Sequence, residues 1–104
     1  MIYELRIYHV APGKMDAINK RFADHTLSIF PDHGIKVSSF YVDATGAERL
    51  YYVCDFESIE AMKKAWASFQ ADQRWIEVKA KSEENGKLVD KVDSYVMDKA
   101  PYFA

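Results

Sequence analysis

The sequence predicts an α+β fold of the ferredoxin-like type, a β-α-β-β-α-β sandwich built on one antiparallel four-stranded sheet. Stretches rich in β-branched and aromatic residues alternate with stretches whose apolar residues recur at helical spacing. Turn residues separate these stretches, as at Pro12-Gly13, Gly34 and Asn85-Gly86. The 104 residues contain no linker, repeat or low-complexity tract, so one domain is expected to span the chain from residue 1 to residue 104.

A Pro-Gly break separates the first strand from the first helix. Residues 2–10 favour a strand, and Pro12-Gly13 ends it. A helix is expected over residues 14–30, closed by the proline and glycine that follow it. Its apolar stripe consists of Met15, Ile18, Phe22 and Ile29, with His25 on the same line.

Two strands, two helical segments and a last strand follow. Strands are expected over residues 35–42 and 49–56, with a turn between them. Ser58 is a suitable N-cap for the next helix, which carries apolar residues at helical spacing, and a shorter helix is expected near residues 72–84. The Asn-Gly turn then predicts a final strand over residues 87–97.

The third strand predicts a second cover for the sheet. Residues 50–54 are apolar on both faces, whereas a sheet with water on one face alternates apolar and polar residues. The same face of another copy would provide that cover, so we expect a two-fold homodimer with sheet packed against sheet. The alternative is a central strand that carries a few exposed aromatic residues.

Composition argues against several classes of function. The formal net charge is −2, and the lysines of residues 79–99 are interleaved with acidic residues, so no nucleic-acid partner is expected. No apolar run is long enough to span a membrane and no signal segment is visible, which favours a cytoplasmic protein without membrane insertion. The single cysteine, Cys54, excludes an intrachain disulfide and is expected to be a small buried hydrophobe.

The chain resembles the NIPSNAP family. The resemblance begins with Tyr3-Glu4-Leu5-Arg6 and Pro12-Gly13-Lys14. It continues through Phe22, His33-Gly34, Phe56-Glu57-Ser58 and Asp72-Gln73-Arg74-Trp75. The resemblance implies the dimeric α+β barrel, a fold that also hosts small monooxygenases, isomerases and haem-handling enzymes. It implies a cavity between sheet and helices but no particular reaction.

Glu4 and Arg6 share one face of the first strand, because side chains alternate with a period of two. If that face meets a partner sheet, each charge needs the other, and we expect the pair to organise the dimer face. The alternative is that Arg6 anchors an anionic substrate and Glu4 acts as a base. Under the dimer hypothesis, Tyr3 faces the helices and any pocket.

His25 is the candidate catalytic residue, because imidazole titrates near neutral pH and this one lies on the apolar stripe. The three histidines are too scattered for a metal motif, so no metal site is expected. Haem would need His25 or Cys54 as its axial ligand, and neither lies in a supporting motif. No Gly-rich phosphate loop is present, and no cofactor is expected.

Aromatic residues are numerous enough to line a ligand pocket, at 14% of the chain. Three hypotheses stay open: a cofactor-independent oxygenase or isomerase that uses His25 as base, a binding or assembly module without turnover, and a solid aromatic core without a pocket. A pocket would suit a small aromatic or apolar ligand. Its expected lining consists of Tyr3, Phe22, Tyr52, Trp66 and Trp75.

Overall fold

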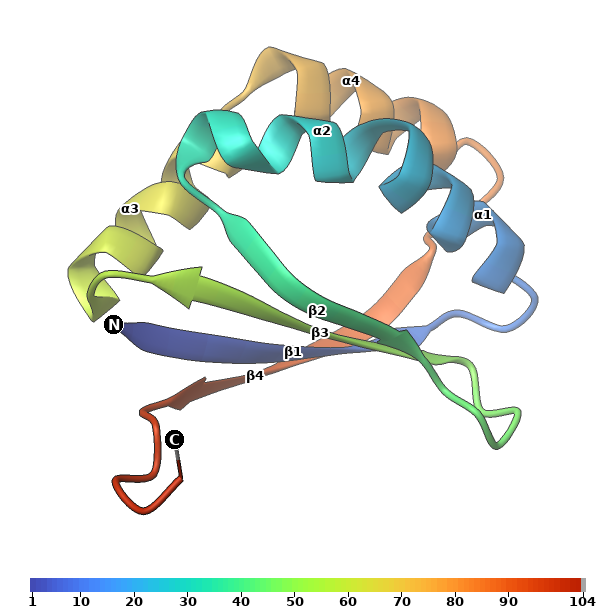
Figure 1. The fold of residues 1–104 in the computed structure, drawn as a ribbon. Helices are drawn as coiled ribbons and strands as arrows, with labels where there is room; N and C mark the ends of the chain where they lie inside the picture. The colour runs from blue at the N-terminus through green and yellow to red at the C-terminus, as the bar shows by residue number, and fades with distance from the viewer. Residues whose placement is uncertain (104) are drawn as a thin grey trace.

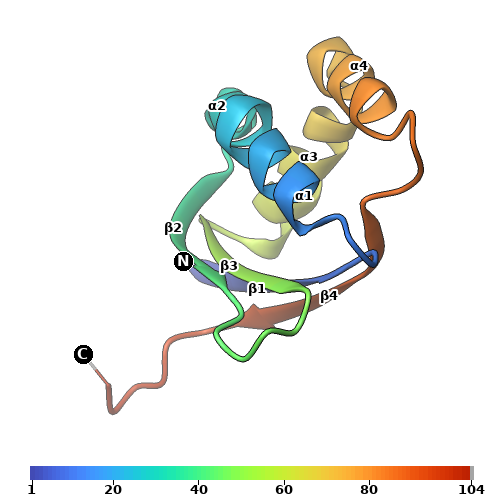
Figure 2. The same ribbon diagram turned by 90° about the vertical axis from the view of Figure 1, so that its right-hand side faces the viewer.

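The computed structural model describes residues 1–103 and has the predicted ferredoxin-like α+β fold. One antiparallel sheet in the order β2-β3-β1-β4 carries all the helices on one face, and its other face is open (Figures 1 and 2). The strands are β1 (Ile2–Val10), β2 (Lys36–Val42), β3 (Arg49–Phe56) and β4 (Val89–Met97). The helical segments are α1 (Met15–Arg21), the π-helical η1 (Phe22–Thr26), α2 (Leu27–Ile29), the 3₁₀ segment η2 (Phe30–His33), α3 (Ile59–Gln70) and α4 (Gln73–Ser82).

The helix ends follow from local side-chain and backbone chemistry. Gly34 ends η2 in the left-handed conformation, with φ of 74°, which glycine adopts at little steric cost. Ser58 caps α3 as predicted, because its Oγ accepts a hydrogen bond from the Ala61 N–H at 3.0 Å. Asp72 caps α4 in the same way through the Arg74 N–H at 2.8 Å. Among residues 1–103, no helix is long and apolar enough to cross a membrane.

The even-numbered residues of β1 face the helices. In register with β3, Glu4 pairs with Cys54 and Arg6 with Tyr52, and these β3 residues belong to the buried core. The expectation that Glu4 and Arg6 face a partner sheet is therefore wrong. Alternation shows which residues share a face, but it cannot show which face the helices cover. For the same reason Tyr3 lies on the open face and does not line a pocket under the helices.

The core between sheet and helices is a continuous group of aromatic rings. Tyr52 is fully buried and stacks on Phe40, with 4.9 Å between ring centroids. Phe22 contacts the Tyr52 ring edge-on at 5.6 Å, and Phe30 lies 5.5 Å from the Trp66 ring. Aromatic contacts of this kind add to the free energy gained by burying apolar surface.

The open face of the sheet is apolar at its centre. Leu5 and Ile7 of β1 lie beside Val53 and Tyr51 of β3, and all four are partly exposed. Tyr95 extends the patch onto β4, next to Leu5, with 55% of its surface exposed. Contiguous exposed apolar surface is a common feature of protein interaction sites.

Candidate functional site

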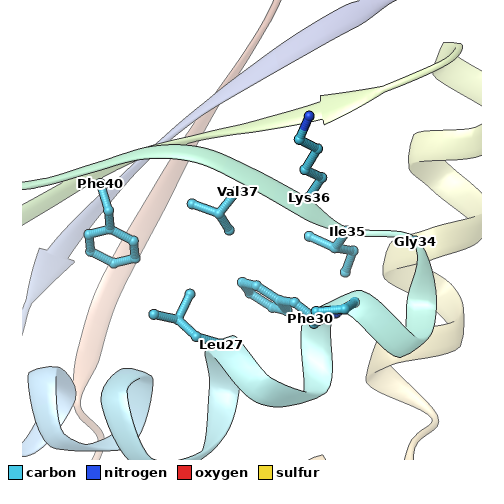
Figure 3. Close-up of a pocket in the computed structure, with 8 residues that line it drawn as sticks. Leu27, Phe30, Gly34, Ile35, Lys36, Val37 and Phe40 are labelled. Atoms are coloured by element: carbon cyan, nitrogen blue, oxygen red, sulfur yellow. The ribbon is translucent and has the colours of Figure 1, made fainter.

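A groove opens between β2 and the helix that precedes it (Figure 3). We call it the β2-edge groove. Its volume is about 550 Å³. The left-handed turn at Gly34 folds the chain back on itself, so that the end of the helical run and the start of β2 form the two walls. The groove is lined by Leu27, Phe30, Pro31, Gly34, Ile35, Lys36, Val37 and Phe40.

A β-bulge in β2 shapes one wall of the groove. The pairing between β2 and β3 shifts between Val37 and Ser39, so Ser38 is an extra residue on the strand. Without the shift, Val37 and Phe40 would point to opposite faces, because they are three residues apart. With it, both side chains point toward Leu27 and Phe30 in Figure 3. The serine doublet between two apolar residues interrupts the alternation, and it is the sequence signal that could have revealed this wall.

The chemistry of the β2-edge groove is apolar. Lys36 is the only titratable residue of its lining, and in Figure 3 its side chain extends away from Phe30. Leu27 stands at the lip with 40% of its surface exposed. The groove therefore offers apolar contact and one cation at its rim, without an acid–base pair.

Beneath the helices, Glu4 is the centre of a buried polar network. It is 2% exposed, and its carboxylate accepts hydrogen bonds from the indole Nε1 of Trp66 at 2.7 Å and from Arg6 at 3.1 Å. The hydroxyl of Ser94 donates a third. A buried carboxylate needs this degree of pairing, because an isolated charge is strongly disfavoured in the protein interior.

Arg6 extends the network to two tyrosines. Its Nε donates to the Tyr52 hydroxyl at 2.9 Å, which donates to the Tyr8 hydroxyl at 3.0 Å, and its guanidinium lies 4.1 Å from the Trp66 ring centroid. Burial lowers the pKa of Arg6, but the nearby oxygens of Tyr52, Tyr8 and Glu4 outweigh it and hold the pKa above its usual range. Burial also raises the pKa of Tyr52. The guanidinium is thus charged and the phenol neutral at physiological pH.

Cys54 is fully buried beside this network, as expected for a small hydrophobe. Burial, with a smaller contribution from the Glu4 carboxylate, raises the pKa of its thiol to about 12. The thiol therefore stays protonated near neutral pH and is a poor nucleophile.

His25 does not lie on the buried stripe of the first helix, and its predicted placement is wrong. The chain forms a π-helical turn over η1, in which the Leu27 N–H bonds to the Phe22 carbonyl five residues back. Such a turn holds an extra residue, so Thr26 takes the buried position and His25 turns out to solvent. His25 lies in a surface hollow between the first helix and α4, near Asp24 and away from the aromatic core.

The remaining predicted pocket residues lie under the helices but pack against one another. Phe22 and Tyr52 are in contact, and Phe69 joins Trp66 to Trp75, with 4.7 Å between the Phe69 and Trp75 rings. The sequence therefore located these aromatic residues on the correct face without distinguishing core from groove. The lining of the β2-edge groove was missed.

His33 connects the end of η2 to the helices α3 and α4. Its Nδ1 lies 2.6 Å from Ser68 Oγ, and its Nε2 lies 2.7 Å from Asp72 Oδ2. The order of groups resembles a Ser-His-Asp triad, but Ser68 lies within α3, whose backbone N–H groups are used in the helix and cannot stabilise an oxyanion. Hydrogen bonds from Arg74 and His33 hold the pKa of Asp72 well below its usual range. We assign this group to fixing the corner between α3 and α4.

No group of three or more His, Cys, Asp or Glu side chains within residues 1–103 is arranged to hold a metal ion.

A family model described as NIPSNAP matches residues 3–103. The fold is similar to that of a NIPSNAP family protein with unknown function from Agrobacterium tumefaciens, with a TM-score of 0.85 and 21% identity over 99% of this chain and 91% of that chain. An uncharacterized NIPSNAP domain protein from Burkholderia xenovorans has a TM-score of 0.84 and 15% identity, over 100% and 99% of the two chains. A putative antibiotic biosynthesis monooxygenase from Nitrosomonas europaea has a TM-score of 0.65 and 8% identity, over 95% and 98%. At these identities the likeness shows the fold alone, and no curated protein matches the chain.

Proposed function

Because the chain belongs to the NIPSNAP family, we propose that it is a homodimeric binding protein whose β2-edge groove holds a small apolar or aromatic molecule. The observation that carries this proposal is the groove itself, about 550 Å³ in volume and lined by apolar side chains from both walls. Sites for small organic molecules have volumes of about 300–1,000 Å³ and are mostly apolar. The partly exposed Phe40 ring and the exposed Leu27 side chain provide the contact surface, over a floor formed by the buried Phe30.

The lining favours binding over turnover. An oxygenase or isomerase that works without a cofactor needs a group that moves a proton at the bound molecule. Lys36 alone is titratable in the lining, and its side chain extends away from Phe30 (Figure 3). The polar groups of the buried network are already engaged, since the Glu4 carboxylate accepts hydrogen bonds from three side chains. We therefore favour a binding module, and the enzyme hypothesis stays a prediction.

The homodimer in this proposal is formed by the open sheet faces of two copies. Accessible surface is 6657 Å², whereas a compact monomer of 12.0 kDa exposes about 6,000 Å². The radius of gyration is 14.2 Å, compared with about 13 Å for a compact domain of this length. A second copy related by a two-fold axis would cover the apolar centre of the open face with an identical apolar surface.

Fluorescence of N-phenyl-1-naphthylamine, an uncharged aromatic probe, tests the groove. We expect the purified protein to bind the probe with enhanced emission, and Leu27→Asp to weaken binding at least tenfold, because a carboxylate at the lip is costly to bury against an apolar ring. Ile59→Asp is the matched control, since Ile59 is a similarly exposed apolar residue at the start of α3. Equal probe affinity for the wild type and both variants would refute the groove as the site.

A further inference from the structure

A second groove lies under α4, on the β4 side of the sheet. We call it the α4 groove. Its volume is about 440 Å³, and Arg6 and Tyr8 of β1, Trp75 of α4 and Val92 of β4 are among its lining residues. The chain that joins α4 to β4 runs down this side of the molecule, away from β2 (Figure 2). The α4 groove is therefore separate from the β2-edge groove, and the two have no lining residue in common.

The α4 groove meets the end of the hydrogen-bonded relay that starts at Arg6. Arg6 Nε donates to the Tyr52 hydroxyl at 2.9 Å, and the Tyr52 hydroxyl lies 3.0 Å from the Tyr8 hydroxyl. Tyr52 is fully buried, whereas Tyr8 is partly exposed. Of the two tyrosines, only Tyr8 belongs to the lining of the groove. A molecule in the groove therefore contacts Tyr8, the last member of the relay, and not Tyr52.

The numbers of donors and acceptors determine the direction of this relay. A guanidinium can only donate hydrogen bonds, so the Tyr52 oxygen accepts from Arg6. The Tyr52 hydroxyl has one proton, and among residues 1–103 the Tyr8 oxygen is its only acceptor. If Tyr8 donated to Tyr52 instead, the buried Tyr52 proton would be unpaired, which is costly. The Tyr8 proton is therefore available to an acceptor outside the relay.

The relay makes the Tyr8 hydroxyl a good donor without adding free charge to the groove. Hydrogen bonds in a chain polarise one another, and each is electrostatically stronger in the protein interior than in water. The charge of Arg6 is balanced by the Glu4 carboxylate at 3.1 Å, and most other cations of the lining are also paired with carboxylates. The groove therefore suits an uncharged acceptor better than an anion.

Aliphatic surface lies next to this donor. Val92 pairs with Tyr8 across the sheet, and 39% of the Val92 surface is exposed. Val89, which is partly exposed, lines the same groove. Sites for small organic molecules combine apolar walls with a few placed polar groups, and the valines and the Tyr8 hydroxyl form such a combination.

We propose that the α4 groove binds a small uncharged carbonyl compound, whose carbonyl oxygen accepts a hydrogen bond from the Tyr8 hydroxyl while its apolar part lies against Val89 and Val92. A carbonyl oxygen only accepts hydrogen bonds, so it complements a site whose available polar group is a donor. Water also accepts from a phenol, but it gains nothing from the aliphatic surface. A carbonyl compound reproduces the hydrogen bond of that water and covers the valines as well.

Acetophenone and α-methylstyrene test this site together with the variant Tyr8→Phe. The two molecules have the same shape, but in α-methylstyrene a methylene group replaces the carbonyl oxygen. In nuclear magnetic resonance titrations we expect Tyr8→Phe to weaken acetophenone binding about three- to tenfold, the contribution of one hydrogen bond, and to leave α-methylstyrene binding unchanged. Infrared spectra should show a higher carbonyl stretching frequency for acetophenone bound to Tyr8→Phe than to the wild type, because the hydrogen bond that lowers it is lost. Equal losses for both molecules, or an unchanged frequency, would refute the hydrogen bond.

Further variants locate the binding to the α4 groove. Val92→Trp fills the groove from an exposed position on β4 and should abolish acetophenone binding, so it provides a second test if Tyr8→Phe does not fold. Tyr51→Phe, which removes a hydroxyl on the open face, is the matched control and should bind acetophenone normally. Leu27→Asp, at the lip of the β2-edge groove, should also bind it normally.

Three results would overturn the assignment of this site. The wild type could fail to bind acetophenone at millimolar concentration, Val92→Trp could bind it as tightly as the wild type, or Leu27→Asp could abolish its binding. The naphthylamine test of the β2-edge groove compares different variants, so the two proposals stand or fall separately.

Discussion

Each face of the sheet holds some side chains of the kind usually found on the other, although the covered face is mainly an apolar core. The face covered by the helices holds Glu4 and Arg6, whereas the open face presents Leu5, Ile7 and Val53. Charges are stable under the helices because each is hydrogen-bonded to the other or to a neighbouring side chain. The apolar residues on the open face are not covered by any element of the described chain, residues 1–103. One face is therefore complete in the monomer, and in the proposed homodimer the other face is covered by a second copy.

Glu4→Leu should have the largest effect on the covered face. It leaves Arg6 buried without its carboxylate and Trp66 Nε1 without an acceptor, so we expect unfolding free energy to fall by about 3–5 kcal/mol. Chemical denaturation measures this change. The double variant Glu4→Leu/Arg6→Leu removes both charges and should lose less than the sum of the single variants. Additive losses would show that the two residues are not coupled.

Variants of two adjacent tyrosines compare how much each face contributes to stability. Tyr52→Phe removes the hydroxyl that joins Arg6 to Tyr8 on the covered face, and should destabilise the protein by about 1–2 kcal/mol. Tyr51→Phe, on the open face, removes a hydroxyl that donates to Asp43 in a partly exposed site, and should cost less. Thermal unfolding of both variants checks the order. A larger loss for Tyr51→Phe would overturn the assignment of the faces.

The smallest effect is expected at the edge of the open face, where His9 Nε2 lies 2.8 Å from Asp93 Oδ2. The hydrogen bond from His9, supported by Lys91, lowers the pKa of Asp93. Because the pKa is lower in the folded protein, the unfolded chain binds the proton at a higher pH than the folded chain does. The stabilisation from this hydrogen bond is therefore present above the unfolded pKa of about 3.9, and it is lost as pH falls through the folded pKa. Asp93→Asn should be slightly less stable than the wild type at pH 6, and the difference should shrink at pH 3. A constant difference in denaturation experiments would contradict this origin.

Much of the fold could be predicted because local signals determine it. Backbone chemistry ends the first strand before Pro12-Gly13 and ends the helical run at Gly34. Side-chain capping begins α3 at Ser58. The orientation of β1 could not be obtained in this way, since it depends on which face the helices cover. Periodicity alone assigned the charged face to a partner, but the hydrogen bonds from Trp66 and Ser94, distant in sequence, stabilise Glu4 under the helices.

The candidate site was less predictable, because two departures from regular geometry create it or relocate its residues. The π-helical turn moves His25 from the expected stripe to the surface, and the bulge at Ser38 brings Val37 and Phe40 to one side. Each departure adds one residue to a regular period: in the strand this exchanges the faces of the residues that follow, and in the helix it changes which residue of the turn is buried. Aromatic composition correctly indicated a rich interior, but it could not separate packed rings from groove walls.

Sedimentation equilibrium determines whether a second copy covers the open face, as we propose. At micromolar concentration the wild type should have twice the 12.0 kDa mass of the chain. Val53→Asp, which puts a carboxylate at the centre of the open face, should have the monomer mass, and Ile59→Asp should stay dimeric. A monomeric wild type, or a Val53→Asp variant that dimerises as tightly as the wild type, would rule out a dimer formed through the open face.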